Sequence, residues 1–209
     1  RAGAGGLRNG LYGLTYCAPH PWNERMSRRR SLLVLAILAT ANAHAGNPEL
    51  AQLAREDQAS RMAAQQDHRD AERRQHVLRI LASGQALDPT DKLNAALVLQ
   101  HTGVAICDGA LRSESAENYL LAHYLAMSAF EAGEQDAATL VAQTIDRYLT
   151  FTEGRQKYGT NRLVDQETGE EYLPPIDRTV TDAERGRYGV PPLQALLARY
   201  KERPAPASP

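Results

Sequence analysis

Apolar residues recur three and four positions apart along most of the chain, which is the pattern of amphipathic helices. We expect one long helix from Leu50 to about Ala82, because nothing in that stretch breaks a helix before Gly84. Asn47-Pro48-Glu49 precedes it and combines a capping side chain, a first-turn proline and an early acid. Further helical segments are expected from Asp88, from Ser115, from Gln135 to Thr150, from Thr181 to Arg185 and from Leu193 to Lys201.

The helical period is lost after Gly154. Residues 162–165 and 171–173 flank Glu167-Thr168-Gly169-Glu170 and predict a small β-hairpin. The predicted fold is therefore mainly α: a helical bundle, or a short array of helix hairpins like tetratricopeptide or Sel1-like repeats, with a small β-hairpin arm near the C-terminus. Only residues 122–149 form a convincing pair of that kind, whereas a solenoid needs about three repeats.

Residues 26–45 have the pattern of a secretory signal peptide. A basic segment, Arg28-Arg29-Arg30, precedes an apolar stretch from Leu32 to about Ala41, and Ala43 and Ala45 supply the small residues of a cleavage site. We expect cleavage after Ala45 and export to the periplasm or the extracellular space. The apolar stretch is shorter than the roughly 20 residues of a membrane span, so we expect no membrane contact after cleavage. A retained anchor and twin-arginine export are the alternatives.

This pattern divides the chain into four parts. Residues 1–25 are expected to be an upstream, non-native extension, and residues 46–202 a single α-helical domain. Residues 203–209 are rich in proline and alanine and are expected to form a disordered tail.

Charge and cysteine content exclude several classes of protein. Residues 1–45 hold six of the 24 basic and one of the 25 acidic residues, so the remainder carries a net charge of −6. A net-acidic domain argues against nucleic acid as a partner. Cys107 alone remains after cleavage, and we expect it to be a buried small hydrophobe. No phosphate-binding, zinc or nucleophile-elbow motif is present, so we expect neither cofactor nor metal.

Two pairs of polar residues stand near helix ends and are candidates for a site. His101 follows Gln100 where an apolar helix ends; it is either a histidine favoured by the helix dipole or a general base facing a pocket. Asp146 and Arg147 are adjacent and do not face each other, so each needs its own partner and the pair could tie its helix to the next loop. His123 is expected to be structural, and metal binding by His68 and His76 is not expected.

The loop after residue 153 is the third candidate. Gly159 offers backbone freedom among residues with neutral donors and acceptors: Gln156, Tyr158, Thr160 and Asn161. Such side chains either bind a polar ligand or satisfy the backbone of an irregular loop.

The order of these residues resembles an uncharacterised bacterial family, a domain of unknown function. The matching motifs are D-Q-x-x-R (Asp57 to Arg61), Gln100-His101, Asp146-Arg147, Q-x-Y-G-T (Gln156 to Thr160), and Asp182 and Arg185 followed by Gly189. The resemblance covers about residues 50–197 and departs from the family at Asn161, where a glutamine is expected. It implies that these polar positions form one set, but it implies no activity.

Two functions fit these observations. In the first, the chain is an exported binding or interaction module for an unknown protein or a small polar ligand. Its ligand-binding candidates are Gln100, Asp146, Arg147, Gln156, Tyr158, Gly159, Thr160 and Arg185. In the second, the chain is a small hydrolase or transferase in which His101 is the base and Tyr158 and Arg147 orient the substrate. The second requires these three side chains to converge in one cleft.

Overall fold

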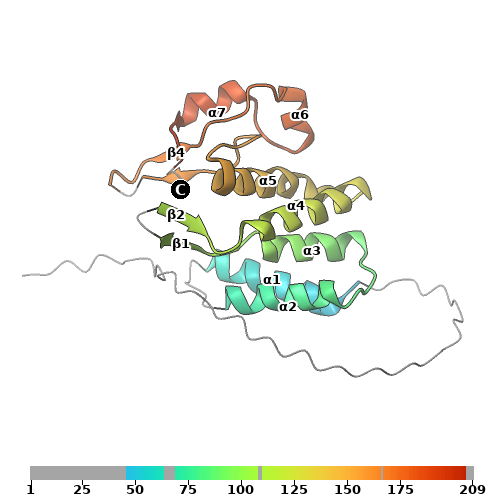
Figure 1. The fold of residues 1–209 in the computed structure, drawn as a ribbon. Coiled ribbons are helices and arrows are strands. Elements are labelled where there is room, and N and C mark those ends of the chain that lie inside the picture. Colours follow the sequence, from blue (N-terminus) through green and yellow to red (C-terminus); the bar gives the residue numbers. More distant parts are fainter. Residues whose placement is uncertain (1–45, 64–68, 108–109, 166, 206–209) are drawn as a thin grey trace, which may run out of the picture.

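Five long helices form a stack, with the first two together at one end (Figure 1). The computed structural model describes residues 46–63, 69–107, 110–165 and 167–205; the predicted extension and signal peptide lie outside this range. The third helix packs against the first two, and the fourth packs between the third and the fifth. The helices are α1 (Pro48–Met62), α2 (Asp70–Ala82), α3 (Pro89–Leu99), α4 (Ala116–Glu131) and α5 (Ala138–Glu153). The mainly helical prediction is confirmed.

Short elements complete the chain. A 3-10 turn, η1 (Gln135–Ala137), leads into α5, and α6 (Asp182–Arg187) and α7 (Leu193–Arg199) cover the far side of α5 in Figure 1. Thr181 caps α6 through its side chain, as its position suggested. No helix in the described part of the chain has both the length and the apolar character that crossing a membrane requires.

Two small sheets lie at the same end of the stack (Figure 1). The first is an antiparallel hairpin of β1 (Val104–Cys107) and β2 (Ala110–Ser113), which we did not predict. In the second, β3 (Leu163–Val164) pairs antiparallel with β4 (Glu171–Leu173), which confirms the predicted hairpin arm. The strand β5 (Lys201–Glu202) adds to the other edge of β4 in parallel.

The predicted single helix over residues 50–82 is wrong, because α1 and α2 lie side by side. Nε2 of His76 is 3.0 Å from Oε2 of Glu49, whereas 27 residues of continuous helix would separate them by about 40 Å. The stretch between the helices has strong helix formers but no apolar stripe. Folding back allows Leu50 and Val77, both 0% exposed, to enter one apolar core.

That core extends from α1 to α7, since Leu173, Tyr188 and Leu196 belong to the same cluster as Leu50. The chain remains ordered just beyond it. Arg203, placed by the sequence in a disordered tail, donates to Oδ2 of Asp165 at 2.7 Å, and its backbone N–H donates to the carbonyl of Leu173 at 2.9 Å. The part of the predicted tail after residue 205 lies outside the described residues.

The start of α1 is tied to the start of α3. The side chain of Asn47 accepts hydrogen bonds from two backbone N–H groups of the first turn of α1. Asp88 and Asp91 form a reciprocal capping box on α3, and Oδ1 of Asp91 also accepts from the Asn47 N–H at 2.6 Å. A methyl group added to Gly46 would lie 3.1 Å from a carboxylate oxygen of each aspartate.

Candidate functional site

The loop that follows α5 wraps around one buried carboxylate. Asp146 is 0% exposed; its Oδ1 accepts from the N–H groups of Lys157 (2.7 Å) and Tyr158 (2.8 Å). Its Oδ2 accepts from the N–H groups of Gly159 (2.9 Å) and Thr160 (2.8 Å), and from the Thr160 hydroxyl (2.7 Å). Burial raises the pKa of Asp146, while the hydrogen bonds act to lower it. Asp146 therefore ties its helix to the loop, as the sequence suggested.

Gln156 and Gly159 fix the remainder of the loop. Gln156 is 0% exposed; its Nε2 donates to the carbonyl of Pro174 and its Oε1 accepts from the Asn161 N–H. Gly159 has φ 98°, and a Cβ there would lie 2.7 Å from Cδ1 of Leu196. Both residues thus serve the packing of the loop.

Tyr158 and Arg185 have internal partners. The Tyr158 ring is buried, its hydroxyl donates to Oε1 of Glu184 at 3.1 Å, and burial raises its pKa to about 12. Arg185 is 1% exposed and donates to the carbonyls of Tyr158, Asp177 and Val180. These contacts favour the second interpretation of the loop, in which polar groups satisfy its backbone.

A different set of residues converges in a cleft of about 320 Å³, which we call the His101 cleft. It lies where the end of α3, the middle of α5 and the loop before β3 meet. Three predicted candidates, Gln100, His101 and Arg147, line it, together with Arg61, Asp70 and Asn161. Its apolar wall consists of Val104, Tyr119, Phe151 and Leu163.

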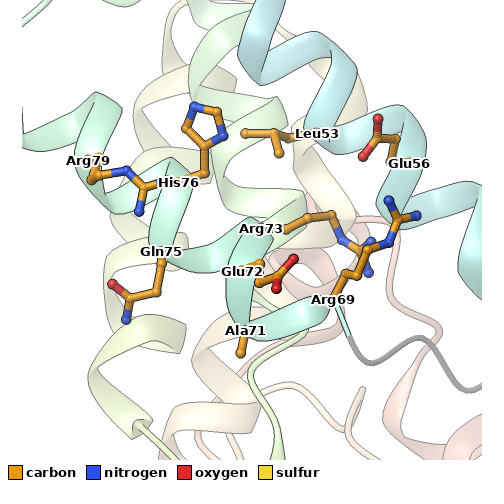
Figure 2. A pocket seen from close by; sticks show the side chains of 9 residues that line it. All are labelled: Leu53, Glu56, Arg69, Ala71, Glu72, Arg73, Gln75, His76 and Arg79. Carbon is orange, nitrogen blue, oxygen red and sulfur yellow. The ribbon is translucent and has the colours of Figure 1, made fainter.

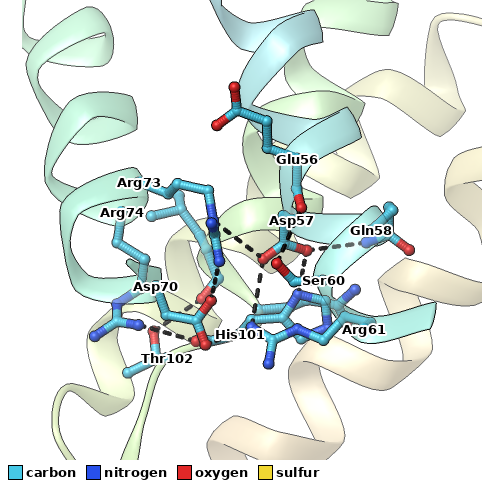
Figure 3. A network of polar contacts seen from close by, with 12 residues as sticks. Glu56, Asp57, Gln58, Ser60, Arg61, Asp70, Arg73, Arg74, His101 and Thr102 are labelled. Carbon is cyan, nitrogen blue, oxygen red and sulfur yellow. Dashed lines mark hydrogen bonds and ion pairs between the residues drawn. The ribbon is translucent and has the colours of Figure 1, made fainter. Parts of the chain in front are cut away.

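His101 is held by a buried carboxylate. Its Nδ1 lies 2.6 Å from Oδ2 of Asp57, which is 1% exposed (Figure 3). His101 is one of the residues that line the cleft, and Nε2 is its second ring nitrogen. No hydrogen bond joins Nε2 to another described residue. An ionised Asp57 fixes the neutral ring as the Nδ1–H tautomer and leaves a lone pair on Nε2.

The same carboxylate joins α1 to α2 (Figure 3). Oδ1 of Asp57 is 3.4 Å from Nη2 of Arg61 and 3.9 Å from Nε of Arg73. Asp70 pairs with both arginines, at 2.5 Å in the case of Arg61. These ion pairs join the end of α1 and the start of α2 to the loop that carries His101.

Arg147 forms one wall of the cleft and has no acidic partner among the described residues. Its Nη1 donates to the backbone carbonyl of Gln100 at 2.6 Å and to the side-chain oxygen of Gln100 at 3.3 Å. Burial lowers the pKa of the guanidinium, and the positive charge of Arg61 acts in the same direction. The cleft therefore holds a cation whose charge no neighbouring carboxylate offsets.

Asn161 contributes an unused donor. Its Nδ2 is buried and has no hydrogen-bond partner among the described residues. Tyr119 and Phe151 face the same space as a stacked pair, with ring centroids 5.7 Å apart and an interplanar angle of 17°. The Tyr119 hydroxyl donates to the carbonyl of Thr102 at 2.9 Å, and burial raises its pKa.

The structure thus separates the residues that the sequence grouped. Tyr158 lines neither the His101 cleft nor the hollow beside α7 described next. The predicted convergence of Tyr158 with His101 and Arg147 in one cleft therefore does not occur. Gly159 and Thr160 line a second hollow of about 580 Å³ beside α7. Sequence reasoning missed Tyr119 and Phe151, whose helical spacing is that of ordinary core residues. Asp57 was singled out in the sequence only as part of the D-Q-x-x-R motif of the resemblance.

A third hollow, of about 540 Å³, lies between α1 and α2 (Figure 2). Glu56, Glu72, Arg69 and Arg79 bring charges of both signs to it, and none of the predicted site residues lines it; His76, which does, pairs with Glu49. The described residues include no group of three His, Cys, Asp or Glu side chains placed to hold a metal. His123 is structural as predicted, since its Nδ1 lies 2.9 Å from the carbonyl of Val141. His68 and the side chain of Cys107 lie outside the described part.

Comparison with known proteins adds no identification. Neither the family models, nor the curated proteins, nor the solved structures contain a match. The resemblance to an uncharacterised bacterial family stays a prediction, and function must be argued from the site.

Proposed function

We propose that the protein is an exported binding module that holds a small polar ligand in the His101 cleft. The observation that carries this proposal is the buried, unpaired Nδ2 of Asn161. A buried donor without a partner costs about 1–3 kcal/mol, so folded proteins retain few of them. Asn161 lines the cleft beside Arg147 and His101, and a rotation of its side-chain amide would bring this donor to an acceptor on a ligand.

The side chains of the cleft favour binding over covalent chemistry. The described lining contains neither serine nor cysteine. Its hydroxyl groups are already engaged, because Thr102 donates to the carbonyl of Leu99 at 2.8 Å and Tyr119 donates to that of Thr102. The residues available to a ligand are therefore hydrogen-bonding and charged groups.

A second function, hydrolysis with His101 as general base, is favoured by one observation. The 2.6 Å contact between Asp57 and Nδ1 of His101 orients the ring and leaves Nε2 open to a water molecule. In this alternative Arg147 still orients the substrate, but Tyr158 has no part.

Replacement of Asn161 by alanine tests the binding proposal. Because the amide donor has no partner, we expect the free energy of unfolding to stay within about 1 kcal/mol of wild type or to rise. In wild type, members of a polar fragment library should shift the NMR signals of the Asn161 side-chain amide, and Asn161→Ala should lose their binding. Asn94→Ala on α3, outside the cleft lining, is the control.

Two results would contradict the proposal: a loss of more than about 2 kcal/mol of stability in Asn161→Ala, which would make Asn161 a structural brace, or a library without any fragment that shifts its amide. Incubation of the bound fragments with the protein separates the two functions. Turnover that disappears in His101→Gln while binding persists would establish the hydrolytic alternative.

A further inference from the structure

We propose that the ligand of the His101 cleft is an organic monoanion, a carboxylate attached to an apolar and preferably aromatic body. This inference rests on the binding function proposed above and specifies its ligand class. Three features of the cleft carry it: the charge of its lining, the placement of its free donors and its aromatic wall.

The lining has one positive charge in excess. Among the described residues that line the cleft, Arg61 and Arg147 are cationic and Asp70 alone is acidic. Nη2 of Arg61 lies 2.5 Å from Oδ2 of Asp70, so these two charges offset each other. Arg147 is left with neutral acceptors only. One negative charge on a ligand would compensate the cleft, whereas a cationic ligand would increase the repulsion.

The other arginines near the cleft have acidic partners. Arg73 pairs with Asp70 and approaches Asp57. Arg74 directs Nη2 to Oε2 of Glu114 at 2.7 Å. The cation without an acidic partner in this region is thus Arg147, which makes its guanidinium the expected anchor for the carboxylate.

Donors at the cleft suit a carboxylate. An ionised carboxylate accepts several hydrogen bonds and prefers charged or amide donors such as guanidinium and side-chain N–H. Arg147 supplies the first, and Asn161, which lines the cleft, supplies the second once its unpaired amide turns toward the ligand. A neutral amide ligand would place an NH₂ group of its own against these donors and would lose one contact.

The apolar side of the cleft favours a ligand that also carries an apolar group. Tyr119 and Phe151 stack with ring centroids 5.7 Å apart, and both line the cleft together with Val104 and Leu163. Offset contacts with aromatic rings favour a flat apolar group. A bare anion such as acetate would leave this wall exposed to water and would bind less tightly.

The test compares three probes on the protein: phenylacetate, phenylacetamide and acetate. Phenylacetate and phenylacetamide have the same shape and differ in charge, whereas acetate lacks the ring. Binding is followed by NMR titration of the backbone amides of the residues that line the cleft and, where Asn161 is present, of its side-chain amide. We expect phenylacetate to bind about tenfold or more tightly than either other probe, because charge-assisted hydrogen bonds are stronger than neutral ones.

Two variants assign the charge effect. Arg147→Gln keeps a donor near the carbonyl of Gln100 but removes the charge, and it should weaken phenylacetate about tenfold while leaving phenylacetamide within about threefold. Arg199→Gln removes an arginine that lines the hollow beside α7 and should change neither. If Arg147→Gln fails to fold, the wild-type comparison and Asn161→Ala still decide the question.

The inference is overturned if phenylacetamide binds as tightly as phenylacetate, if Arg147→Gln weakens both equally, or if phenylacetate does not bind at about 10 mM, where fragments of this size are expected to be detected. Failure of the ligand class is distinguishable from failure of the proposed function. When neutral fragments still shift the Asn161 amide, only the ligand class falls; when no fragment does, the binding function falls as well.

Discussion

Asp146 directs both carboxylate oxygens at backbone N–H groups, so a charged residue acts here as a structural bracket for four consecutive residues. The bracket is what allows the chain to leave α5 in an irregular path without stranding buried donors. The adjacent Arg147 points elsewhere and enters the cleft. The two adjacent residues therefore have different roles: Asp146 holds the loop after α5, and Arg147 lines the His101 cleft.

Replacement of Asp146 by asparagine should destabilise the protein by about 3 kcal/mol. The amide keeps the shape, but its NH₂ group opposes backbone N–H groups and leaves at least two of them without an acceptor. Denaturant unfolding measures the loss. Asp136→Asn in the η1 turn, at an exposed acid, is the control and should stay within about 0.5 kcal/mol of wild type. An equal loss of unfolding free energy in both variants would contradict the structural role assigned to Asp146.

Sequence reasoning reached part of this arrangement at the level of single residues. Helical geometry alone says that Asp146 and Arg147 face different partners, and the structure agrees. The same reasoning left open whether Tyr158 and Gly159 bind a ligand or pack the loop, because both roles use the same residue types. The sequence could not predict that Nδ2 of Asn161 lacks a hydrogen-bond acceptor, because this depends on which groups surround it in the folded protein.

At the scale of elements, the apolar periodicity located α3, α4 and α5 well, because each has a capping signal or a glycine at its end. The break between α1 and α2 was missed because the sequence there lacks glycine and proline and is rich in alanine and glutamine. Only tertiary burial, which brings Leu50 and Val77 together, decides against one long helix. The strand β5 was missed for a similar reason: its partner β4 lies about 30 residues earlier in the sequence.

Gly159 joins the loop to α7, and this contact is testable. Gly159→Ala adds a methyl group 2.7 Å from Leu196 Cδ1 and 2.9 Å from Ile176 Cδ1, at φ 98°. We expect a loss of about 2–4 kcal/mol in the free energy of unfolding, from backbone strain and overpacking together. Gly169→Ala separates the two causes, because its φ is 72° with no atom within 4 Å of the added methyl group. A loss in Gly159→Ala no larger than that in Gly169→Ala would exclude the packing contribution.

At the scale of the whole molecule, the helices form a linear stack with both small sheets at one end (Figure 1). The His101 cleft draws side chains from the first, second, fourth and fifth helices, from the turn that ends the third, and from β1 and β3. Composition and periodicity predicted the mainly helical class. They did not predict the cleft, because residues from Arg61 to Leu163 meet there through packing that has no local signature.

Asp88 and Asp91, at the start of α3, have no cationic partner among the described residues, and one carboxylate oxygen of each would lie 3.1 Å from a methyl group added to Gly46. Cleavage after Ala45 would create an α-ammonium group on Gly46, one bond away from the Cα that carries this methyl position. A chain that begins at Gly46 should therefore be about 1 kcal/mol more stable than one that begins at Ala43. Because an amine that gains acidic partners has a raised pKa, the difference should be full between about pH 5 and 7, where the carboxylates are ionised, and should vanish as the pH rises above the raised pKa of the amine. Equal unfolding curves at pH 7 would contradict it.

The consequence concerns the uncleaved chain as well. If residues 26–45 are the predicted leader, the uncleaved chain would lack this charge at Gly46 and would be less stable than the cleaved chain by the same amount. Cleavage of the leader would then allow the α-ammonium group of Gly46 to pair with Asp88 and Asp91. Asp88 and Asp91 would in that case add their stabilising contact only after cleavage.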